Sequence, residues 1–343
     1  MKKAICILIL GMIAAAKCAA CTRVTYCGDN CVATGRTLDW RTPIPTSLRV
    51  MPRGRQQASF DVDSLALRWT ASYGSVVAIG YDMGVSEGLN ECGLAVNILY
   101  LPGAVYTLPD EHRRVMSASV WALYLLDNFA TTSEAVESLS RDLFHLDAPA
   151  MADGSATAIH LAMSDSVGDC AVVEYVDGRL SISHGKEFDV LTNAPTFDDQ
   201  LAVSRYWQGV GGMHMLPGTN RSSDRFARAT FYRSVLPSAL SRRDALAAVT
   251  GIVRNCAVPL GISVEGSPEI STTQWISVSD QLQRVYYFQL TLSPSAVWID
   301  LRQTDLSAGS PQLTVTLTDD GAQSGDITRQ LLPAPDFRPV FRL

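Results

Sequence analysis

The order of predicted secondary structure along the chain is the feature that most constrains its fold. Runs with strand character come first, a helical pair follows, and then come more strands, a second helical block and final strands. Alternating βαβ units would predict a parallel sheet, whereas this blockwise order predicts a layered α+β fold with antiparallel sheets. The predicted strands are residues 22–26, 32–38, 75–82, 93–101, 157–165, 170–184, 274–280, 284–290 and 297–301.

Turn and helix signals divide this pattern further. Asp177-Gly178 separates two alternating runs and predicts a hairpin, since both turn positions tolerate positive φ. The segment 115–130 is apolar nearly all round and predicts a helix packed between layers. A capping box from Thr131 to Glu134 begins the next helix, and an amphipathic helix follows from Ser241.

No Pro- or Gly-rich linker interrupts the chain, so we expect residues 21–343 to form a single domain. The polar composition of residues 303–343 predicts a partly ordered C-terminal extension, to which the sequence assigns no role.

The first twenty residues have the three zones of a signal peptide. Lys2 and Lys3 precede an apolar run over residues 4–16, and small residues at 18–20 come directly before Cys21. The run is too short for a membrane span. We therefore expect residues 1–20 to be a signal peptide cleaved between Ala20 and Cys21, and the mature protein to be periplasmic or secreted, without a membrane segment.

Composition excludes several classes of function. Loss of three lysines with the leader would take the formal net charge from −6 to −9, which disfavours nucleic-acid binding. The sequence has no P-loop, no GxGxxG motif and no paired CxxC. In an oxidising compartment Cys27 and Cys31, at either end of a Gly-Asp-Asn turn, could form a disulfide or stay reduced. A zinc site there is disfavoured, because no histidine or second close pair accompanies them.

Cys21 would be the first residue of the mature chain. A nucleophilic cysteine needs a base, and none of the five histidines lies in a recognisable cysteine-protease context. The free α-amine of an N-terminal residue, with an ordinary pKa of about 7.7–8.0, can serve as that base once cleavage exposes it. The alternatives are a lipoprotein anchor, although the sequence before Cys21 lacks the expected large aliphatic residue, and a plain structural cysteine.

Two charged residues follow in GRTLDW, at positions 35–40. If segment 32–38 pairs back along segment 22–26, Arg36 and Asp39 return to the terminus. Asp39 could then orient the α-ammonium group, and Arg36 could favour the thiolate. The alternative is an ion pair on the surface at a strand end.

Several fragments in order give the chain a resemblance to a family. CTRVTY and GRTLDW, followed by GLNECGLAVNILYL, VLTNAPTFD, RFARATFYR, TTQWISVSD and VWIDL, resemble the choloylglycine hydrolase group. This group contains bile salt hydrolases and penicillin V acylases. The resemblance covers nearly all of residues 21–302 and implies a four-layer αββα N-terminal nucleophile hydrolase fold with antiparallel sheets.

The resemblance also implies roles for individual residues. Cys21 would be the nucleophile, with Arg36 and Asp39 holding the thiol and α-amine. Asn193 matches an asparagine of the oxyanion hole, where a fixed amide N–H meets the negative oxygen of a tetrahedral intermediate. Without the motif, Asn193 would be read as capping a turn before a proline. Arg225 matches an arginine near the nucleophile and would otherwise be an ordinary charge on a helix surface.

Two aromatic residues bear on the substrate. Tyr100 falls where bile salt hydrolases have asparagine and penicillin V acylases tend to have an aromatic residue, although a shifted alignment would place Asn97 there. With Tyr100 in register, a backbone N–H replaces the asparagine side chain and the ring shapes an acyl pocket. Trp40 either lines that pocket or packs in the core.

The function implied by the resemblance is cleavage of a small-molecule acyl amide, without a metal or organic cofactor. Penicillin V acylase-like activity ranks first, followed by deacylation of N-acyl homoserine lactones and then of conjugated bile salts. A non-catalytic exported binding protein is the alternative from another class. Resemblance to family members that form tetramers also implies a homo-oligomer.

Overall fold

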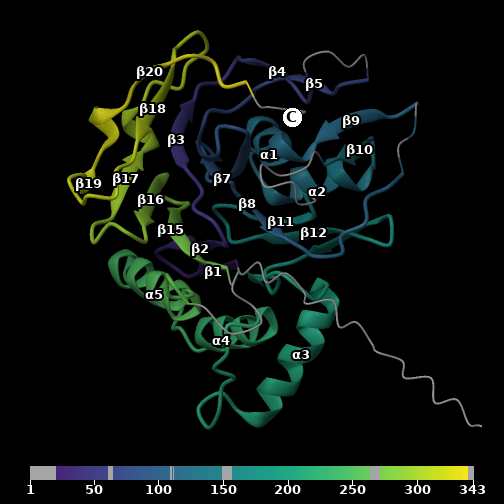
Figure 1. The fold of residues 1–343 in the computed structure, drawn as a ribbon, viewed down its shortest axis with the longest axis vertical. Helices are drawn as coiled ribbons and strands as arrows, with labels where there is room; N and C mark the ends of the chain where they lie inside the picture. The colour runs from purple at the N-terminus through teal and green to yellow at the C-terminus, as the bar shows by residue number, and fades with distance from the viewer. Residues whose placement is uncertain are drawn as a thin grey trace, which may run out of the picture.

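Two large β-sheets pack face to face between two layers of helices (Figure 1). The computed structural model describes residues 21–60, 65–108, 110, 112–148, 157–262 and 271–338. The expected signal peptide, residues 1–20, lies outside the described residues. The layered arrangement with antiparallel sheets is the one predicted from the order of elements.

The first sheet contains the start of the described chain. Its neighbouring strands are antiparallel except for the last pair, which is parallel. Its seven described strands, in spatial order, are β14 (Val190–Leu191), β1 (Thr22–Cys27), β2 (Val32–Trp40), β15 (Thr272–Asp280), β16 (Val285–Leu290), β17 (Val297–Asp300) and β19 (Gly325–Asp326).

The second sheet is antiparallel throughout its described strands. Asp177 and Gly178, with φ of 50° and 75°, form the predicted hairpin turn within it. Its nine described strands are β13 (Arg179–His184), β12 (Cys170–Val176), β11 (Ile159–Ser164), β8 (Ala95–Tyr100), β7 (Gly84–Asn90), β6 (Ser75–Gly80), β3 (Thr46–Met51), β18 (Gln312–Thr316) and β20 (Leu332–Ala334). Two small pairs lie apart from the large sheets, β4 (Gln56–Ala58) with β5 (Arg68–Thr70) and β9 (Arg114–Ser117) with β10 (Phe144–Asp147).

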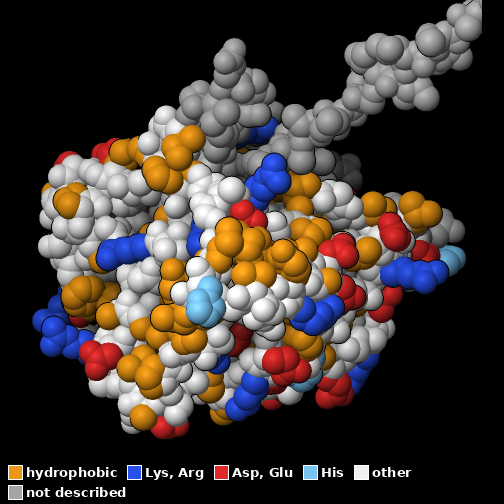
Figure 2. All heavy atoms as spheres, turned by 90° about the horizontal axis from the view of Figure 1, so that it is seen from below, with side chains coloured by type: hydrophobic (Ala, Val, Ile, Leu, Met, Phe, Trp, Pro, Cys, Tyr) orange, Lys and Arg blue, Asp and Glu red, His pale blue; other side chains and the backbone are white. Residues whose placement is uncertain are grey.

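Helices cover the outer face of each sheet. The first sheet is covered by α4 (Ser222–Ser234) and α5 (Arg242–Cys256), with α3 (Phe197–Val210) packed against α4, and the second by α1 (Trp121–Asn128) and α2 (Thr132–Ser140). Short 3-10 turns are η1 (Ala118–Val120), η2 (Leu301–Gln303) and η3 (Thr328–Gln330). Figure 2 shows the face that carries α3, α4 and α5, where hydrophobic side chains gather among scattered charges of both signs. Among the described residues, no helix combines the length and apolar character needed to cross a membrane.

The predicted helix boundaries are confirmed in two places and wrong in one. Thr131 and Glu134 form the capping box of α2, and the Ser241 side chain caps α5. The helix expected from Val115 begins instead at Trp121, because residues 114–117 form β9, which pairs in parallel with β10. An apolar run serves a buried strand as well as a helix, so composition did not separate the two.

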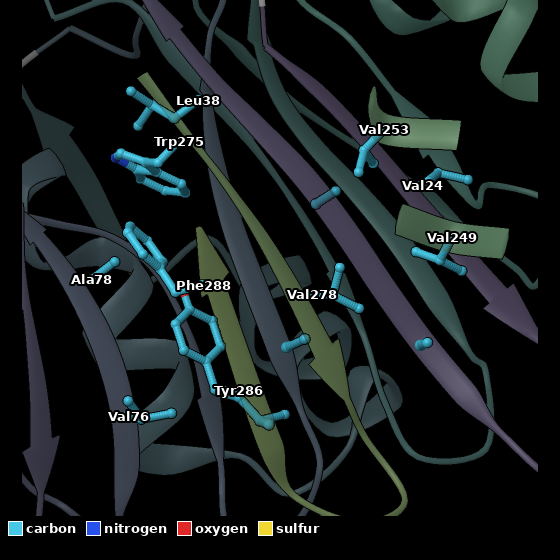
Figure 3. Packing of buried hydrophobic residues seen from close by; sticks show 14 of the residues in the cluster. Val24, Leu38, Val76, Ala78, Val249, Val253, Trp275, Val278, Tyr286 and Phe288 are labelled. Atoms are coloured by element: carbon cyan, nitrogen blue, oxygen red, sulfur yellow. The ribbon is translucent and has the colours of Figure 1, made fainter. Parts of the chain in front are cut away.

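Large apolar side chains fill the space between the two sheets. Trp275 and Phe288 pack with ring centroids 4.8 Å apart and ring planes tilted by 39°, and Val76 and Ala78 of β6 face them (Figure 3). Tyr286 continues the row and is fully buried. Burial of such side chains stabilises each by about 1.5–3 kcal/mol, so this layer fixes how the sheets stack.

A glycine lets α5 approach the first sheet closely. A Cβ on Gly35 of β2 would lie 2.6 Å from Val249 Cγ1 and 3.0 Å from Val253 Cγ1, which is closer than packed carbon atoms allow. Val249 and Val253 therefore pack directly on the strand backbone (Figure 3).

The C-terminal segment differs from the extension expected over residues 303–343. Its described part supplies β18 and β20 to the second sheet and β19 to the first. Gln312 and Phe337 are buried, and Arg49 lies over the Phe337 ring at 5.8 Å. The composition misled because these short strands bury only part of their side chains.

Of the two alternatives for Cys27 and Cys31, the structure has the reduced one, with both thiols free. Cys27 pairs with Val32 in the β1–β2 register, so Cys31 lies beyond the last pair. The Cys27 Sγ is 3.7 Å from the Val167 carbonyl oxygen, whereas burial raises the pKa of the Cys31 thiol to about 12.

The packing of the C-terminal segment generates a stability prediction. Phe337→Ala removes a buried ring and should lower the free energy of unfolding by about 3 kcal/mol. Leu332→Ala, at a side chain that is 66% exposed, should change it by less than about 0.5 kcal/mol. Urea denaturation of both variants checks this; equal, small effects would mean that the segment does not pack.

Candidate active site

A cavity of about 160 Å³ opens between the two sheets at the start of β1. Cys21, Arg36 and Asp39 line one part of it. The rest of the wall is mainly apolar and includes Leu38, Trp40, Ile44, Met83, Val85, Ile98, Tyr100 and Ile159. A reactive group beside an apolar chamber suits a ligand with a hydrophobic portion.

The β1–β2 pairing brings Arg36 to the Cys21 thiol. Thr22 pairs with Thr37 and Arg23 with Arg36, so the return strand runs back to Cys21 as the sequence predicted. Arg36 Nη2 lies 3.7 Å from Cys21 Sγ, and both side chains are buried. The alternative of a surface ion pair is therefore wrong.

Arg36 is held in a strongly charged environment. Its Nη1 donates to Glu87 Oε2 at 2.8 Å, and Nη2 also donates to the Ile98 carbonyl oxygen at 2.7 Å. Burial alone would lower the pKa of Arg36, but neighbouring Cys21 and Glu87 outweigh it and raise the pKa. The guanidinium thus stays charged beside the sulfur and favours a thiolate there.

The Asp39 carboxylate is fully buried and is held by hydroxyl groups. Thr273 Oγ1 donates to Oδ1 at 2.6 Å, and Thr37 Oγ1 donates to Oδ2 at 3.2 Å. Burial raises the pKa of Asp39 to about 6, although Arg225 and the two hydroxyls oppose the rise. Asp39 is therefore a carboxyl group that changes charge near pH 6.

Asn193 follows β14 and contacts the Cys21 main chain. Its Oδ1 accepts from the Cys21 nitrogen at 2.5 Å, and its Nδ2 donates to the Tyr100 carbonyl oxygen at 2.7 Å. Its own backbone is fixed by Ser222 and by Gln200, which donates to the Asn193 carbonyl oxygen at 2.7 Å. Hydrogen bonds therefore fix the Asn193 side-chain amide in the site, and its role is not limited to capping a turn.

Arg225, on α4, is fully buried and closes the site from the helical layer. Its Nη1 donates to the Cys21 carbonyl oxygen at 2.5 Å and to Thr22 Oγ1 at 2.6 Å. Its Nη2 donates to Asn193 Oδ1 at 3.0 Å. Burial lowers the pKa of Arg225, against the opposing charge of Asp39. The alternative of a helix-surface charge is therefore wrong.

Tyr100 and Trp40 meet in the cavity wall. Their rings make an edge contact with centroids 5.5 Å apart and an interplanar angle of 77°. Trp40 is also buried and part of the core cluster, so both interpretations of this residue hold. Asn97, the alternative to Tyr100, lies outside the cavity lining and accepts from Arg23 Nε at 3.0 Å.

The structure thus brings together Cys21, Arg36, Asp39, Asn193 and Arg225, although their chemical roles stay predictions. Sequence reasoning missed Glu87, Thr37 and Thr273, which hold Arg36 and Asp39. Glu87 lies in β7, which was not among the predicted strands, so no sequence signal marked its burial. In the described part of the chain, no group of three or more His, Cys, Asp or Glu residues could hold a metal ion.

Comparisons with known proteins give a family match and several similar relatives. A model of the linear amide C–N hydrolases, choloylglycine hydrolase family, matches residues 21–319. Penicillin V acylase from Pectobacterium atrosepticum is 36% identical over 344 residues, spanning 93% of this chain and 91% of that protein. Bile salt hydrolase/transferase from Bifidobacterium longum is 23% identical over 304 residues, spanning 80% of this chain and 93% of that protein.

Solved structures give the same fold. Penicillin V acylase from Agrobacterium tumefaciens superposes with a TM-score of 0.86 at 40% identity, covering 93% of this chain and 99% of that one. A mutant of conjugated bile acid hydrolase from Clostridium perfringens superposes with a TM-score of 0.76 at 22% identity, covering 89% of this chain and 98% of that one. The fold is the predicted αββα N-terminal nucleophile hydrolase fold.

The burial of Asp39 generates a pH prediction. Because the folded pKa is about 6 and the ordinary value is 3.8, the folded state binds more protons between these values. Asp39 should therefore contribute a fall in stability as pH rises through this window, of up to about 3 kcal/mol. Asp39→Asn should lack this part of the fall and keep the parts due to Asp127 and Asp189, whose pKa values burial also raises, to about 8 and about 6.

The measurement is the free energy of unfolding in urea from pH 4 to pH 7. Asp319→Asn, which removes an exposed carboxylate, is the control and should follow the wild-type curve. Parallel curves for wild type and Asp39→Asn would contradict the raised pKa.

Proposed function

Because the chain belongs to the choloylglycine hydrolase family of linear amide C–N hydrolases, we propose that it is a penicillin V acylase-like enzyme with Cys21 as its nucleophile. The observation that carries this proposal is the Cys21 thiol beside Arg36 Nη2, at 3.7 Å, on the wall of an apolar cavity. The similarity to penicillin V acylases, at 36% and 40% identity, supports the substrate class.

The base in this proposal is the α-amine of Cys21, which exists only after residues 1–20 are removed. The leader pattern supports export to the periplasm or outside the cell and cleavage at this position. The family match, which begins at Cys21, supports the same boundary. No histidine is among the described residues that line the cavity, so the amine is the base that the geometry favours.

The reaction follows from these positions. The amine takes the thiol proton, directly or through a water, and the thiolate attacks the amide carbonyl carbon. The oxyanion is stabilised by the second N–H of Asn193 Nδ2 and a main-chain N–H of β8. The proton then passes to the leaving nitrogen, the C–N bond breaks, and water hydrolyses the thioester to release the acid and restore the thiol. In this proposal, groups of the chain itself transfer the protons and stabilise the developing charge.

The cavity wall supports an aromatic acyl group. Trp40 and Tyr100 present an edge-packed pair beside the thiol, and aliphatic side chains complete the wall. A phenoxyacetyl ring could pack against these rings, as aromatic pairs favour. The scissile amide of penicillin V would then lie at Cys21.

The experiment that tests the proposal is hydrolysis by the processed protein of penicillin V, an N-acyl homoserine lactone and glycocholate. Release of phenoxyacetate should proceed with the highest kcat/KM of the three. A higher value for the lactone or for glycocholate would replace the proposed substrate, and no turnover of any would support a binding protein.

Removing the thiol should abolish the reaction. Cys21→Ala leaves no nucleophile, so we expect kcat for penicillin V to fall by about a thousandfold or more. Cys92→Ala, which removes a half-buried thiol on the β7–β8 turn, should keep wild-type kcat. Hydrolysis by Cys21→Ala at the rate of the control would refute the nucleophile.

Retaining the leader should also block the reaction. A chain in which Ala20 still precedes Cys21 has an amide nitrogen in place of the amine base. We expect it to be inactive until the leader is removed, with intact mass reporting the terminus. Turnover by a chain whose mass includes residues 1–20 would contradict the proposed base.

A further inference from the structure

Glu87 of β7 is a buried charge that the proposed reaction does not use. Its side chain is fully buried. Its Oε2 accepts from Arg36 Nη1 at 2.8 Å and from Asn97 Nδ2 at 3.1 Å, and its Oε1 accepts from Tyr286 Oη at 2.5 Å. A buried carboxylate costs stability unless such partners compensate it, so its position calls for a reason beyond packing.

These contacts fix the plane of Arg36. Because a guanidinium is rigid and planar, holding Nη1 at Glu87 sets the direction of Nη2. Nη2 then reaches Cys21 Sγ at 3.7 Å and the Ile98 carbonyl oxygen at 2.7 Å. The guanidinium carbon also lies 5.0 Å from the centroid of the Trp275 ring. Glu87 therefore holds Nη1 of the guanidinium, and Nη2 is the nitrogen that contacts the thiol.

The ion pair also joins the two sheets at the site. Arg36 comes from β2 of the first sheet and Glu87 from β7 of the second. Tyr286, on β16 of the first sheet, donates to the same carboxylate, and burial together with Glu87 raises the pKa of its hydroxyl, which keeps it a donor. Glu87 therefore has hydrogen-bond partners in both sheets in addition to its ion pair with Arg36.

We propose that Glu87 is a positioning residue that holds the Arg36 guanidinium against the Cys21 thiol and moderates its charge there. The inference rests on the proposed function, since it gives Glu87 a part in the reaction of Cys21. It predicts different effects for losing the side chain and for losing only its charge.

Glu87→Ala removes the acceptor and frees the guanidinium to turn. Misplacing a group beside a nucleophile costs rate more than binding, so kcat should fall about tenfold or more while KM changes less than about threefold. Alkylation of Cys21 by iodoacetamide should need a higher pH, because the cation no longer faces the sulfur.

Glu87→Gln keeps an oxygen that can accept from Arg36 but removes the negative charge. Arg36 would then act on the sulfur without a counter-charge, so half-maximal alkylation should move to lower pH by about half a unit or more. This variant carries the test if Glu87→Ala does not fold. Mass spectrometry of the peptide that contains Cys21 separates its alkylation from that of other thiols.

Glu91→Gln is the matched control, because Glu91 pairs with Arg53 at the same 2.8 Å but near the surface. It should leave kcat and the alkylation profile unchanged. The proposal is overturned if Glu87→Gln alkylates with the wild-type pH dependence, or if Glu91→Gln shifts it equally. Lower melting temperatures with unchanged kcat and alkylation would likewise reduce Glu87 to a structural residue.

Failure of the proposed function gives a separate signal. Alkylation requires no substrate, so it reports on the Glu87–Arg36–Cys21 arrangement even if Cys21→Ala retained hydrolysis. In that case the nucleophile assignment would fall, and a shifted alkylation profile would still support the positioning of Arg36.

Discussion

The antiparallel register between β1 and β2 is the constraint on which the site depends. It sets Arg23 opposite Arg36 and Thr22 opposite Thr37, so the return strand delivers Arg36 and Asp39 beside Cys21. Because successive side chains on a strand point to opposite faces, a slip of one residue would turn both groups away. Close packing of α5 on Gly35 and pairing of β15 along β2 hold the strand in this register.

Around this register the structure gathers buried charges that compensate one another. Arg36 faces Glu87 across the sheets, while Arg225 and Asp39 influence each other from the helical layer. In a low-dielectric interior, each charge acts strongly on its neighbours, so the arrangement tunes the reacting atoms as well as the fold. The apolar wall of the cavity, which includes Trp40 and Tyr100, is the part against which the proposed hydrophobic acyl group would pack.

Local sequence made part of this site predictable. Cys21, Arg36 and Asp39 lie within two neighbouring strands, and alternation together with a turn predicted their return to one place. Asn193 and Arg225 are far from these strands in the sequence, so only the resemblance to the family identified them as candidates. Glu87 was missed because its role depends on Arg36 and Tyr286, which belong to the other sheet, and no local pattern encodes that meeting.

The fold was predictable at the level of layers and less so at its edges. The order of the elements identified the antiparallel layers, and one capping box and one amphipathic pattern identified two helix starts. The predicted start of α1 was wrong because Val115 and Met116 suit a buried strand as well as a helix. The C-terminal strands were missed since Gln312 and Val315 are buried within a stretch whose composition is polar.

The place of β18 in the second sheet has a consequence for how the chain acquires its structure. This strand pairs with β3, joining residues near 315 to residues near 48, and β15 likewise joins β2 across more than half the chain. Contacts of such long sequence separation cost loop-closure entropy before they contribute stability. During synthesis, one edge of β3 therefore stays unpaired until nearly the whole chain has left the ribosome. Folding should be slow and late, and an incomplete chain would expose a strand edge open to aggregation.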